Sequence, residues 1–236
     1  MSAFFELHKD LPREGPGDLE SLNWAFSNID LAQSAVILDA ACGPGADIEG
    51  LLGQVPLGRV VGLDKHQPFV DVATSKFANH DRVQIVQGDM ATPPGGSYDA
   101  IWCAGALYFL GVEAGLKAWS AHIKPGGFVI FSEPLFFTDA PSQGAMSFWD
   151  GHKTGSQADV LNAIEKAGYH LIAERKLPDA AWEAYYVPME ARITQLRKLA
   201  DPSLEAVLDE GDAEISGWRA HKSETGYGQF VVQAKS

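Results

Sequence analysis

The chain has 236 residues, of which 46% are hydrophobic and 21% are charged. A chain of this length and composition buries most of its apolar surface around one core, which excludes an intrinsically disordered or disulfide-stapled protein. The formal net charge of −13 repels phosphate groups at long range, so nucleic acids and anionic membranes are not expected partners.

Short apolar runs alternate with helix-length segments through the first half of the chain. The runs are rich in valine, isoleucine or aromatic residues and are bounded by Gly, Asp or Pro, as expected of strands buried on both faces. They are Ala35–Leu38, Val60–Leu63, Val83–Val86, Ala100–Ala104 and Phe128–Phe131. The helical segments between them are Ala46–Val55, Gln67–Asn79 and Val112–Ile123. This alternation predicts an α/β fold with a doubly wound, mostly parallel sheet.

The second half continues the alternation more loosely. We expect helices and strands at Ser156–Ala167 (helix), Tyr169–Arg175 (strand), Met189–Leu199 (helix), Ser203–Ser216 (helix) and Tyr227–Ala234 (strand). The long excursion before the last strand predicts that this strand returns antiparallel and that an antiparallel pair closes the sheet at its edge. Three aromatic-rich segments fit neither strands nor crossover helices and are candidates for a cover over a ligand site: the N-terminal 30 residues, Glu133–Thr154 and Pro178–Pro188.

No targeting or redox signal in the sequence directs the chain out of the cytoplasm. The longest uncharged apolar stretch, Ala100–Val112, is shorter than the roughly 20 residues that a membrane helix needs. The N-terminus lacks a basic segment followed by an apolar run, so the sequence predicts a cytoplasmic protein. Its two cysteines, Cys42 and Cys103, match no zinc-binding spacing. We expect both to be free thiols and predict no metal site.

A glycine turn follows the first predicted strand. The stretch runs from Val36 through Asp39 and Cys42 to Gly43-Pro44-Gly45 and then opens a helix. A backbone without side chains at Gly43 and Gly45 can approach a ligand closely, and the helix that follows presents unpaired N–H groups. Asp64 ends the next strand, 25 residues after Asp39, where a carboxylate can accept both hydroxyls of a ribose. The sequence therefore predicts a nucleotide-like ligand with a ribose.

Two cofactor classes share this layout. A dinucleotide fingerprint requires a third glycine where this sequence has Ile48, whose side chain prevents close packing over a pyrophosphate. A nicotinamide-dependent oxidoreductase is therefore the second interpretation. The stretch instead resembles the first motif of class I S-adenosylmethionine-dependent methyltransferases, in which an acidic residue precedes a Gly-x-Gly turn. Asp39, Gly43 and Gly45 match, whereas Ala41 stands where the family usually has glycine, which predicts a slightly wider turn.

The resemblance covers about residues 35–133 and implies roles for further residues. It places the ribose on Asp64 and the adenine amino group on Asp89, with Met90 against the adenine ring. The strand Tyr98–Cys103 and the turn Lys124-Pro125-Gly126-Gly127 resemble the family's fourth strand and the turn into its fifth. The implied cofactor is S-adenosylmethionine, converted to S-adenosylhomocysteine, and the implied cofactor-binding residues are Arg13, Asp39, Ala40, Ala41, Cys42, Gly43, Gly45, Asp64, Lys65, Asp89, Met90 and Cys103. The implied fold is a seven-stranded Rossmann-like sheet.

Other segments resemble a narrower group of bacterial small-molecule methyltransferases, mostly of unassigned substrate. They include Arg13–Gly17, Gly105–Tyr108, Ser132–Pro134, Phe148-Trp149 and Pro178–Pro188. This resemblance spans almost the whole chain and implies one domain over residues 1–236, with an N-terminal cover (1–33), a cofactor-binding half (34–134) and an acceptor-side half (135–236). It implies methyl transfer to a small molecule without naming the acceptor, and the oligomeric state is left open.

Methyl transfer is an in-line displacement, so alignment of the acceptor with the methyl group can supply much of the acceleration. A base is needed only if the acceptor carries a proton, and the candidates are Tyr108, Glu133 and His152. Each has a structural alternative: Tyr108 as a core residue, Glu133 as a paired residue at a strand end, and His152 as a solvated loop residue. In related enzymes an Asn-Pro-Pro-Tyr or Asp-Pro-Pro-Tyr motif after the fourth strand holds amino groups for the methylation of amides and nucleic acids. This sequence has Cys103-Ala104-Gly105-Ala106 there, which disfavours DNA methylation.

The cover segments supply the candidate acceptor site. Large aromatic rings there can exclude water and attract a cation, although packing of the cover against the sheet is an alternative role for many of them. The predicted acceptor-binding residues are Tyr108, Phe148, Trp149, Trp182, Tyr185 and Tyr186. A module that binds S-adenosylmethionine without turnover remains a further alternative.

Overall fold

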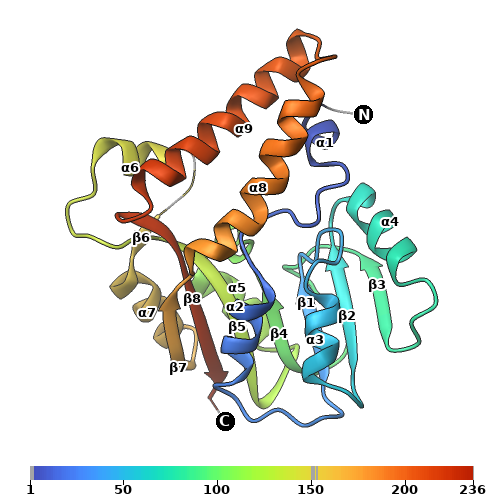
Figure 1. Cartoon of the computed structure of the whole chain (residues 1–236). Helices are drawn as coiled ribbons and strands as arrows, with labels where there is room; N and C mark the ends of the chain where they lie inside the picture. Colours follow the sequence, from blue (N-terminus) through green and yellow to red (C-terminus); the bar gives the residue numbers. More distant parts are fainter. Residues whose placement is uncertain (1–2, 150–151, 153, 236) are drawn as a thin grey trace.

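A computed structural model describes residues 3–149, 152 and 154–235. Within them, a mostly parallel sheet runs in the order β3-β2-β1-β4-β5-β8-β7, and the two-residue β6 pairs with β5 beside this path (Figure 1). The strands are β1 (Val36–Ala40), β2 (Arg59–Asp64), β3 (Val83–Gln87), β4 (Tyr98–Cys103), β5 (Ile123–Phe136), β6 (Gly155–Ser156), β7 (Tyr169–Lys176) and β8 (Thr225–Ala234). The predicted doubly wound sheet is confirmed.

The predicted antiparallel pair also closes the sheet. Strand β8 pairs antiparallel with β5 on one side and with β7 on the other. The last strand in the chain therefore occupies the place next to the edge, and β7 is the edge strand.

The two faces of the central strands bury different apolar clusters, because successive side chains of a strand point to opposite faces. Leu38 packs in one cluster with Leu63 and Ile101. Ile37 packs in the other with Val60. This two-sided burial explains why the strands read as continuous apolar runs.

Crossover helices cover both faces. Helices α2 (Leu19–Phe26) and α3 (Ile48–Gln54) contact each other and contribute to the cluster around Ile37. Helices α5 (Val112–Trp119) and α7 (Gln157–Lys166) contribute to the cluster around Leu38. Helix α4 (Gln67–Lys76) follows β2 and packs beside β3.

A further group of helices lies over the end of the sheet where the parallel strands finish (Figure 1). It consists of α1 (Ala3–His8), α6 (Gln143–Phe148), α8 (Asp179–Leu196) and α9 (Pro202–His221). Helix α9 packs against α1, α6 and α8. Their aromatic core includes Trp149, Trp182 and Trp218. None of the described helices is both long enough and apolar enough to cross a membrane.

All three predicted cover segments contain more regular structure than the sequence indicated. We expected Pro178–Pro188 to be separate from a helix beginning at Met189, but α8 begins at Asp179 and continues through Pro188. Proline removes one helical hydrogen bond, and the loss is tolerated here because Trp182, Tyr186 and Met189 are buried along the same helix. The N-terminal segment likewise holds α1 and α2, and Glu133–Phe136 extends β5 through its pairing with β8.

Candidate active site

A cleft of about 1180 Å³ opens between the sheet and the helices above it. Small-molecule sites are commonly about 300–1,000 Å³, so this cleft has room for two ligands side by side. One end lies over the strand ends at Asp39 and Asp64, and the other is walled by α8 and α9 at Tyr185 and Glu214. Glu14 of the N-terminal segment lines the cleft beside the glycine turn, since a Cβ atom added at Gly43 would lie 3.4 Å from its Cγ.

The glycine turn forms the floor of the first end. Ala41, Gly43 and Gly45 all have left-handed backbone conformations, with φ of 64°, 54° and 80°. The turn is tied to β2 because the amide of Cys42 donates to the carbonyl of Leu63 at 2.9 Å. Ala41 thus adopts a conformation that favours glycine, which is the residue that the resemblance led us to expect there.

Asp64 is buried beside this turn, and two backbone amides hold its carboxylate. Gly43 N–H donates to Oδ2 at 2.9 Å, and His66 N–H donates to Oδ1 at 2.8 Å. Each carboxylate oxygen can accept a further hydrogen bond. The side chain is therefore oriented before any ligand binds, and both oxygens retain capacity for a pair of hydroxyls.

Asp39 lies at the base of the cleft with one unpartnered oxygen. Its side chain is 3% exposed, and Oδ2 is buried without a hydrogen-bond partner among the described residues. Burial, followed by the charges of Asp47 and Asp64, raises the pKa of this carboxyl well above its usual value. A positively charged ligand group beside Asp39 would lower this pKa again, because an opposite charge stabilises the ionised carboxylate.

Asp89 and Met90 lie further along the strand ends. The carboxylate of Asp89 accepts from the amide of Ala91 at 2.9 Å and lies 3.6 Å from the ammonium of Lys65. The indole of Trp119 donates to the carbonyl of Met90 at 2.7 Å and so fixes the backbone of this segment. The carboxylate of Asp89 is half-exposed toward the cleft, where a ligand could reach it.

The N-terminal segment crosses the cleft and closes it with charged pairs. The guanidinium of Arg13 lies 3.4 Å from the carboxylate of Asp47, which also accepts from the indole of Trp102 at 3.0 Å. Nδ1 of His8 lies 2.6 Å from Oε2 of Glu14. Burial raises the pKa of Glu14 despite this contact with His8.

Aromatic residues line the second end of the cleft. The ring of Trp182 stacks on Trp218 at 5.0 Å between centroids and lies 4.9 Å from the ring of Tyr227. Tyr227 also interacts with Tyr108 through their hydroxyls, and burial raises the pKa of Tyr108 to about 12. Tyr185 is 5% exposed and completes this wall.

Most of the sequence-predicted site residues lie along this one cleft. The lining residues among them are Arg13, Asp39, Ala41, Cys42, Gly43, Asp64, Lys65, Asp89, Met90, Tyr108, Phe148, Trp149, His152, Trp182 and Tyr185. The cleft therefore joins residues from the N-terminus, the strand ends and the helical cover.

Five predicted residues lie outside the lining. Ala40 and Cys103 are fully buried within the sheet. Gly45 faces α4, since a Cβ atom added there would lie 2.8 Å from the ring of Phe77. Tyr186 is also fully buried, and its hydroxyl donates to Glu214 at 3.0 Å. Glu133 is 6% exposed in β5, and burial raises its pKa to about 8.

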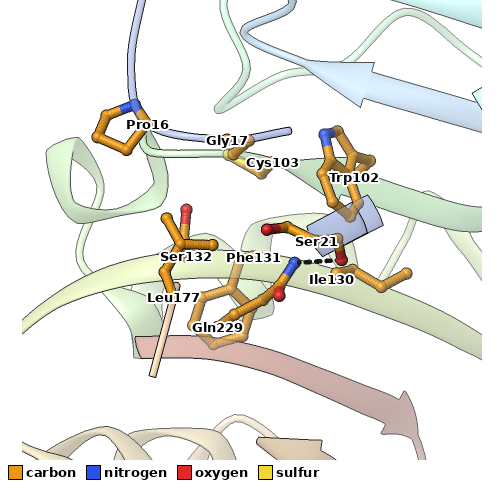
Figure 2. A pocket seen from close by; sticks show the side chains of 11 residues that line it. Pro16, Gly17, Ser21, Trp102, Cys103, Ile130, Phe131, Ser132, Leu177 and Gln229 are labelled. Carbon is orange, nitrogen blue, oxygen red and sulfur yellow. Dashed lines mark hydrogen bonds between the residues drawn. The ribbon is translucent and has the colours of Figure 1, made fainter. Parts of the chain in front are cut away.

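A separate small cavity of about 10 Å³ lies where the N-terminal segment crosses the sheet (Figure 2). Gln229 donates from its amide to the carbonyl of Ser21 at 3.1 Å beside it, and Cys103 is one of its lining residues. A volume of this size holds about one water molecule. This cavity lies in the contact between the N-terminal segment and the sheet and is too small for a ligand.

Sequence reasoning missed several lining residues, chiefly His8, Asp47, Glu214 and Tyr227. Glu214 lies on α9 at helical spacing from Glu210 and Gly217, and all three line the cleft. This helix also has polar residues on its outer face, so its pattern did not distinguish a cleft-facing glutamate from a solvated one. Glu14 stands inside the quoted Arg13–Gly17 motif, which was the available signal for it.

Comparisons with known proteins identify the architecture around this cleft. Residues 37–127 match the family described as "Methyltransferase domain". The chain is also 29% identical over 192 residues to a trans-aconitate 2-methyltransferase of Azoarcus sp. (strain BH72). The matched region covers 80% of this chain and 69% of that protein. The protein is an S-adenosylmethionine-dependent methyltransferase.

Two solved methyltransferase structures share the whole fold. One from Geobacter sulfurreducens, in complex with S-adenosylhomocysteine, superposes with a TM-score of 0.83 at 18% identity and covers 99% of this chain and 98% of its own. One from Thiobacillus denitrificans, also in complex with S-adenosylhomocysteine, gives a TM-score of 0.79 at 19% identity and covers 100% of both chains. The Rossmann-like methyltransferase fold and the predicted cofactor are thereby confirmed.

Proposed function

We propose that this methyltransferase acts on a small molecule, with the cofactor over the strand ends and the acceptor under α6, α8 and α9. The observation that carries the proposal is that one cleft joins Asp39 and Asp64 at one end with Tyr185 and Glu214 at the other. Its volume of about 1180 Å³ suits two small ligands, and a macromolecular acceptor would require a more open face.

The cofactor half offers complementary groups for each part of S-adenosylmethionine. Asp64 would accept the ribose hydroxyls, while Asp89 and Met90 would hold the adenine. Gly43 lets the backbone approach, and the unpartnered Oδ2 of Asp39 suits the ammonium of the methionine part. When bound, the cofactor supplies a methyl group on a positively charged sulfur.

The acceptor half would exclude water and align the attacking atom. Tyr108 lies between the two halves, with its ring 5.2 Å from that of His152 and 6.4 Å from that of Tyr227. Alignment can contribute about 7–11 kcal/mol toward such a displacement without a dedicated base. Tyr108 and His152 line the cleft and are candidates to receive a proton, whereas Glu133 would have to act through other groups.

The acceptor named for the Azoarcus relative, trans-aconitate, does not match the charges of this cleft. Trans-aconitate carries three carboxylates, which require cationic partners. Of the described residues that line the cleft, the arginine and lysine side chains are Arg13 and Lys65, and each already lies beside a carboxylate, Asp47 or Asp89. A different acceptor class therefore fits better.

The two alternative functions, a nicotinamide-dependent oxidoreductase and a binding module without turnover, gain no support. Ile48 is fully buried in the cluster around Ile37, so the third glycine of a dinucleotide turn has no equivalent. A binding module without turnover would not need an enclosed second compartment beside the cofactor.

The direct test combines calorimetry with an acceptor screen. We expect S-adenosylmethionine to bind and NAD not to bind, and we expect a panel of small metabolites to yield S-adenosylhomocysteine with at least one acceptor. Asp64→Asn serves as a matched variant, because it keeps the side-chain shape while removing the charge. Binding of NAD in place of S-adenosylmethionine would overturn the cofactor assignment, and cofactor binding without turnover on any acceptor would favour the binding module.

A further inference from the structure

We propose that the methyl acceptor is an amine, bound as its ammonium ion by Glu214 among the aromatic residues at the second end of the cleft. The proposal rests on the proposed function, since it names the class of acceptor for that same site. It depends on the charge, the burial and the hydrogen bonding of the residues that wall this compartment.

Glu214 offers a carboxylate oxygen to the cleft. Its Oε1 accepts from the hydroxyl of Tyr186 at 3.0 Å, and Oε2 has no hydrogen-bond partner among the described residues. The side chain keeps exposed surface because it lines the cleft, yet protein surrounds it closely enough that burial raises its pKa. A carboxylate that faces a cleft with one free oxygen is suited to a charged donor.

The other charges nearby are mostly negative. Glu14 lines the same cleft from the N-terminal segment, beside Gly43, and Glu210 lines it one helical turn before Glu214. Against them stand imidazoles, of which His8 contacts Glu14 and His221 lies 3.6 Å from Glu224. Within the described part of the lining, no lysine or arginine is free of a carboxylate partner. A carboxylate or phosphate on the acceptor would meet repulsion here.

The remaining wall is aromatic. Trp149, Trp182, Tyr185 and Tyr227 are each at most 7% exposed, and with Tyr108 they line the compartment. Electron-rich rings stabilise an ammonium group within about 6 Å, including one that already carries methyl groups. Aromatic rings together with a carboxylate are thus a combination that favours an amine over a neutral or anionic acceptor.

The same groups allow the chemistry of N-methylation. The ammonium first transfers one proton to Oε2 of Glu214 and becomes a neutral amine. The nitrogen lone pair then forms the bond to the methyl carbon as the carbon–sulfur bond breaks, and the bonding pair of electrons remains on sulfur. The product is a methylated ammonium with S-adenosylhomocysteine, so no further reactant is needed.

Two matched probes test the charge preference. Calorimetry on the protein loaded with S-adenosylhomocysteine compares 2-phenylethylamine with 3-phenylpropionate, which carry an ammonium and a carboxylate on similar skeletons. We expect the amine to bind at least about tenfold more tightly. Equal or tighter binding of the carboxylate, or no binding of the amine at millimolar concentration, would overturn the proposal.

Variants then test the residue. Glu214→Gln keeps an oxygen for the Tyr186 hydroxyl and removes the charge, so we expect a loss of about 10- to 150-fold in amine affinity. Glu205→Gln, on an exposed turn of the same helix, should change nothing. If Glu214→Gln does not fold, Glu14→Gln should also lower the affinity for the amine. Unchanged amine affinity in a folded Glu214→Gln protein would refute the role of this carboxylate.

A screen of acceptors separates this inference from the proposed function. Methyl transfer to amines, with none to carboxylic acids or phenols, is the expected result. Turnover confined to carboxylic acids or phenols would overturn the amine assignment and leave the proposed function standing. Failure to bind S-adenosylhomocysteine at all would instead count against the proposed function.

Discussion

The backbone amide of Gly43 donates a 2.9 Å hydrogen bond to Oδ2 of Asp64, and this bond joins the glycine turn after β1 to the end of β2. The carboxylate is consequently positioned by the same turn that would approach the cofactor. Two features that the sequence places 21 residues apart therefore act as one unit.

We predict that Asp64→Ala weakens S-adenosylmethionine binding by about 10- to 150-fold, because charge-assisted hydrogen bonds contribute about 1.5–3 kcal/mol. Asp64→Asn should lose less, since its amide oxygen can still accept from one backbone amide. Isothermal titration calorimetry measures both. Unchanged affinity in Asp64→Ala would refute the assignment of the ribose to this carboxylate.

Ala41→Gly should stabilise the protein by about 0.5–1 kcal/mol, because Ala41 holds a left-handed conformation with φ of 64°. Gly43→Ala is the reciprocal change, with φ of 54° at that residue, and should destabilise the protein by about 1 kcal/mol. Urea denaturation with both variants checks the signs. A stability loss in Ala41→Gly would mean that the alanine methyl group contributes packing that outweighs the backbone preference.

The core of the sheet was predictable because each central strand is buried on two faces. Runs such as Val60–Leu63 have no polar alternation, and this pattern combined with glycine and aspartate boundaries indicates parallel strands. The cofactor end was predictable for a related reason. Its residues follow directly after those strands, so their places along the chain fix their places at one edge of the sheet.

The acceptor end was only partly predictable. Pro188 suggested a boundary, but burial of Trp182 and Tyr186 on α8 outweighs the missing hydrogen bond. Glu214 gave no signal, because a cleft-facing carboxylate and a solvated one look alike in a polar helix. Such positions depend on how separate helices pack, which no local pattern in the sequence records.

Cys42 and Cys103 are predicted to stay reduced in the native protein. They follow or end the neighbouring strands β1 and β4, and burial raises the pKa of both thiols. Because the thiolate is the reactive form, we expect negligible reaction with a disulfide reagent until denaturant is added. Rapid labelling of the folded protein, or a mass two hydrogens below that of the reduced chain, would contradict this prediction.

Glu133 should make stability fall as pH rises. Burial raises its pKa from 4.5 to about 8, so between these values the folded state holds a proton that the unfolded state has released. The stabilisation that the bound proton gives is complete below pH 4.5 and is lost by about pH 8. Between these values the free energy of unfolding falls by up to about 1.4 kcal/mol per pH unit. Glu133→Gln cannot ionise and should show a shallower decline.

Urea denaturation of both proteins at several pH values measures this difference. The stability of the wild type relative to Glu133→Gln should decrease steadily from about pH 5 to about pH 7.5. The other carboxyls with raised pKa values, Asp39, Glu14 and Glu214, are common to both proteins and cancel in the comparison. Parallel curves would show that Glu133 ionises normally in the folded protein.

The aromatic wall of α8 should affect methyl transfer more than cofactor binding. Trp182 and Tyr185 line the acceptor end of the cleft, while the groups proposed to hold the cofactor are at the strand ends. We predict that the double substitution Trp182→Phe and Tyr185→Phe leaves the Kd of S-adenosylmethionine within about threefold. The same substitution should lower kcat/KM at least about tenfold, a loss of roughly 1.4 kcal/mol in transition-state stabilisation.

Phenylalanine is chosen because alanine at two buried positions would open a destabilising cavity. Tyr169→Phe is the control, since the hydroxyl of Tyr169 donates to the carbonyl of Leu116 away from the cleft. Equal turnover in the double variant and the control would mean that these rings serve only to pack α8, and the acceptor would then have to be oriented by Tyr108 and the residues of α9.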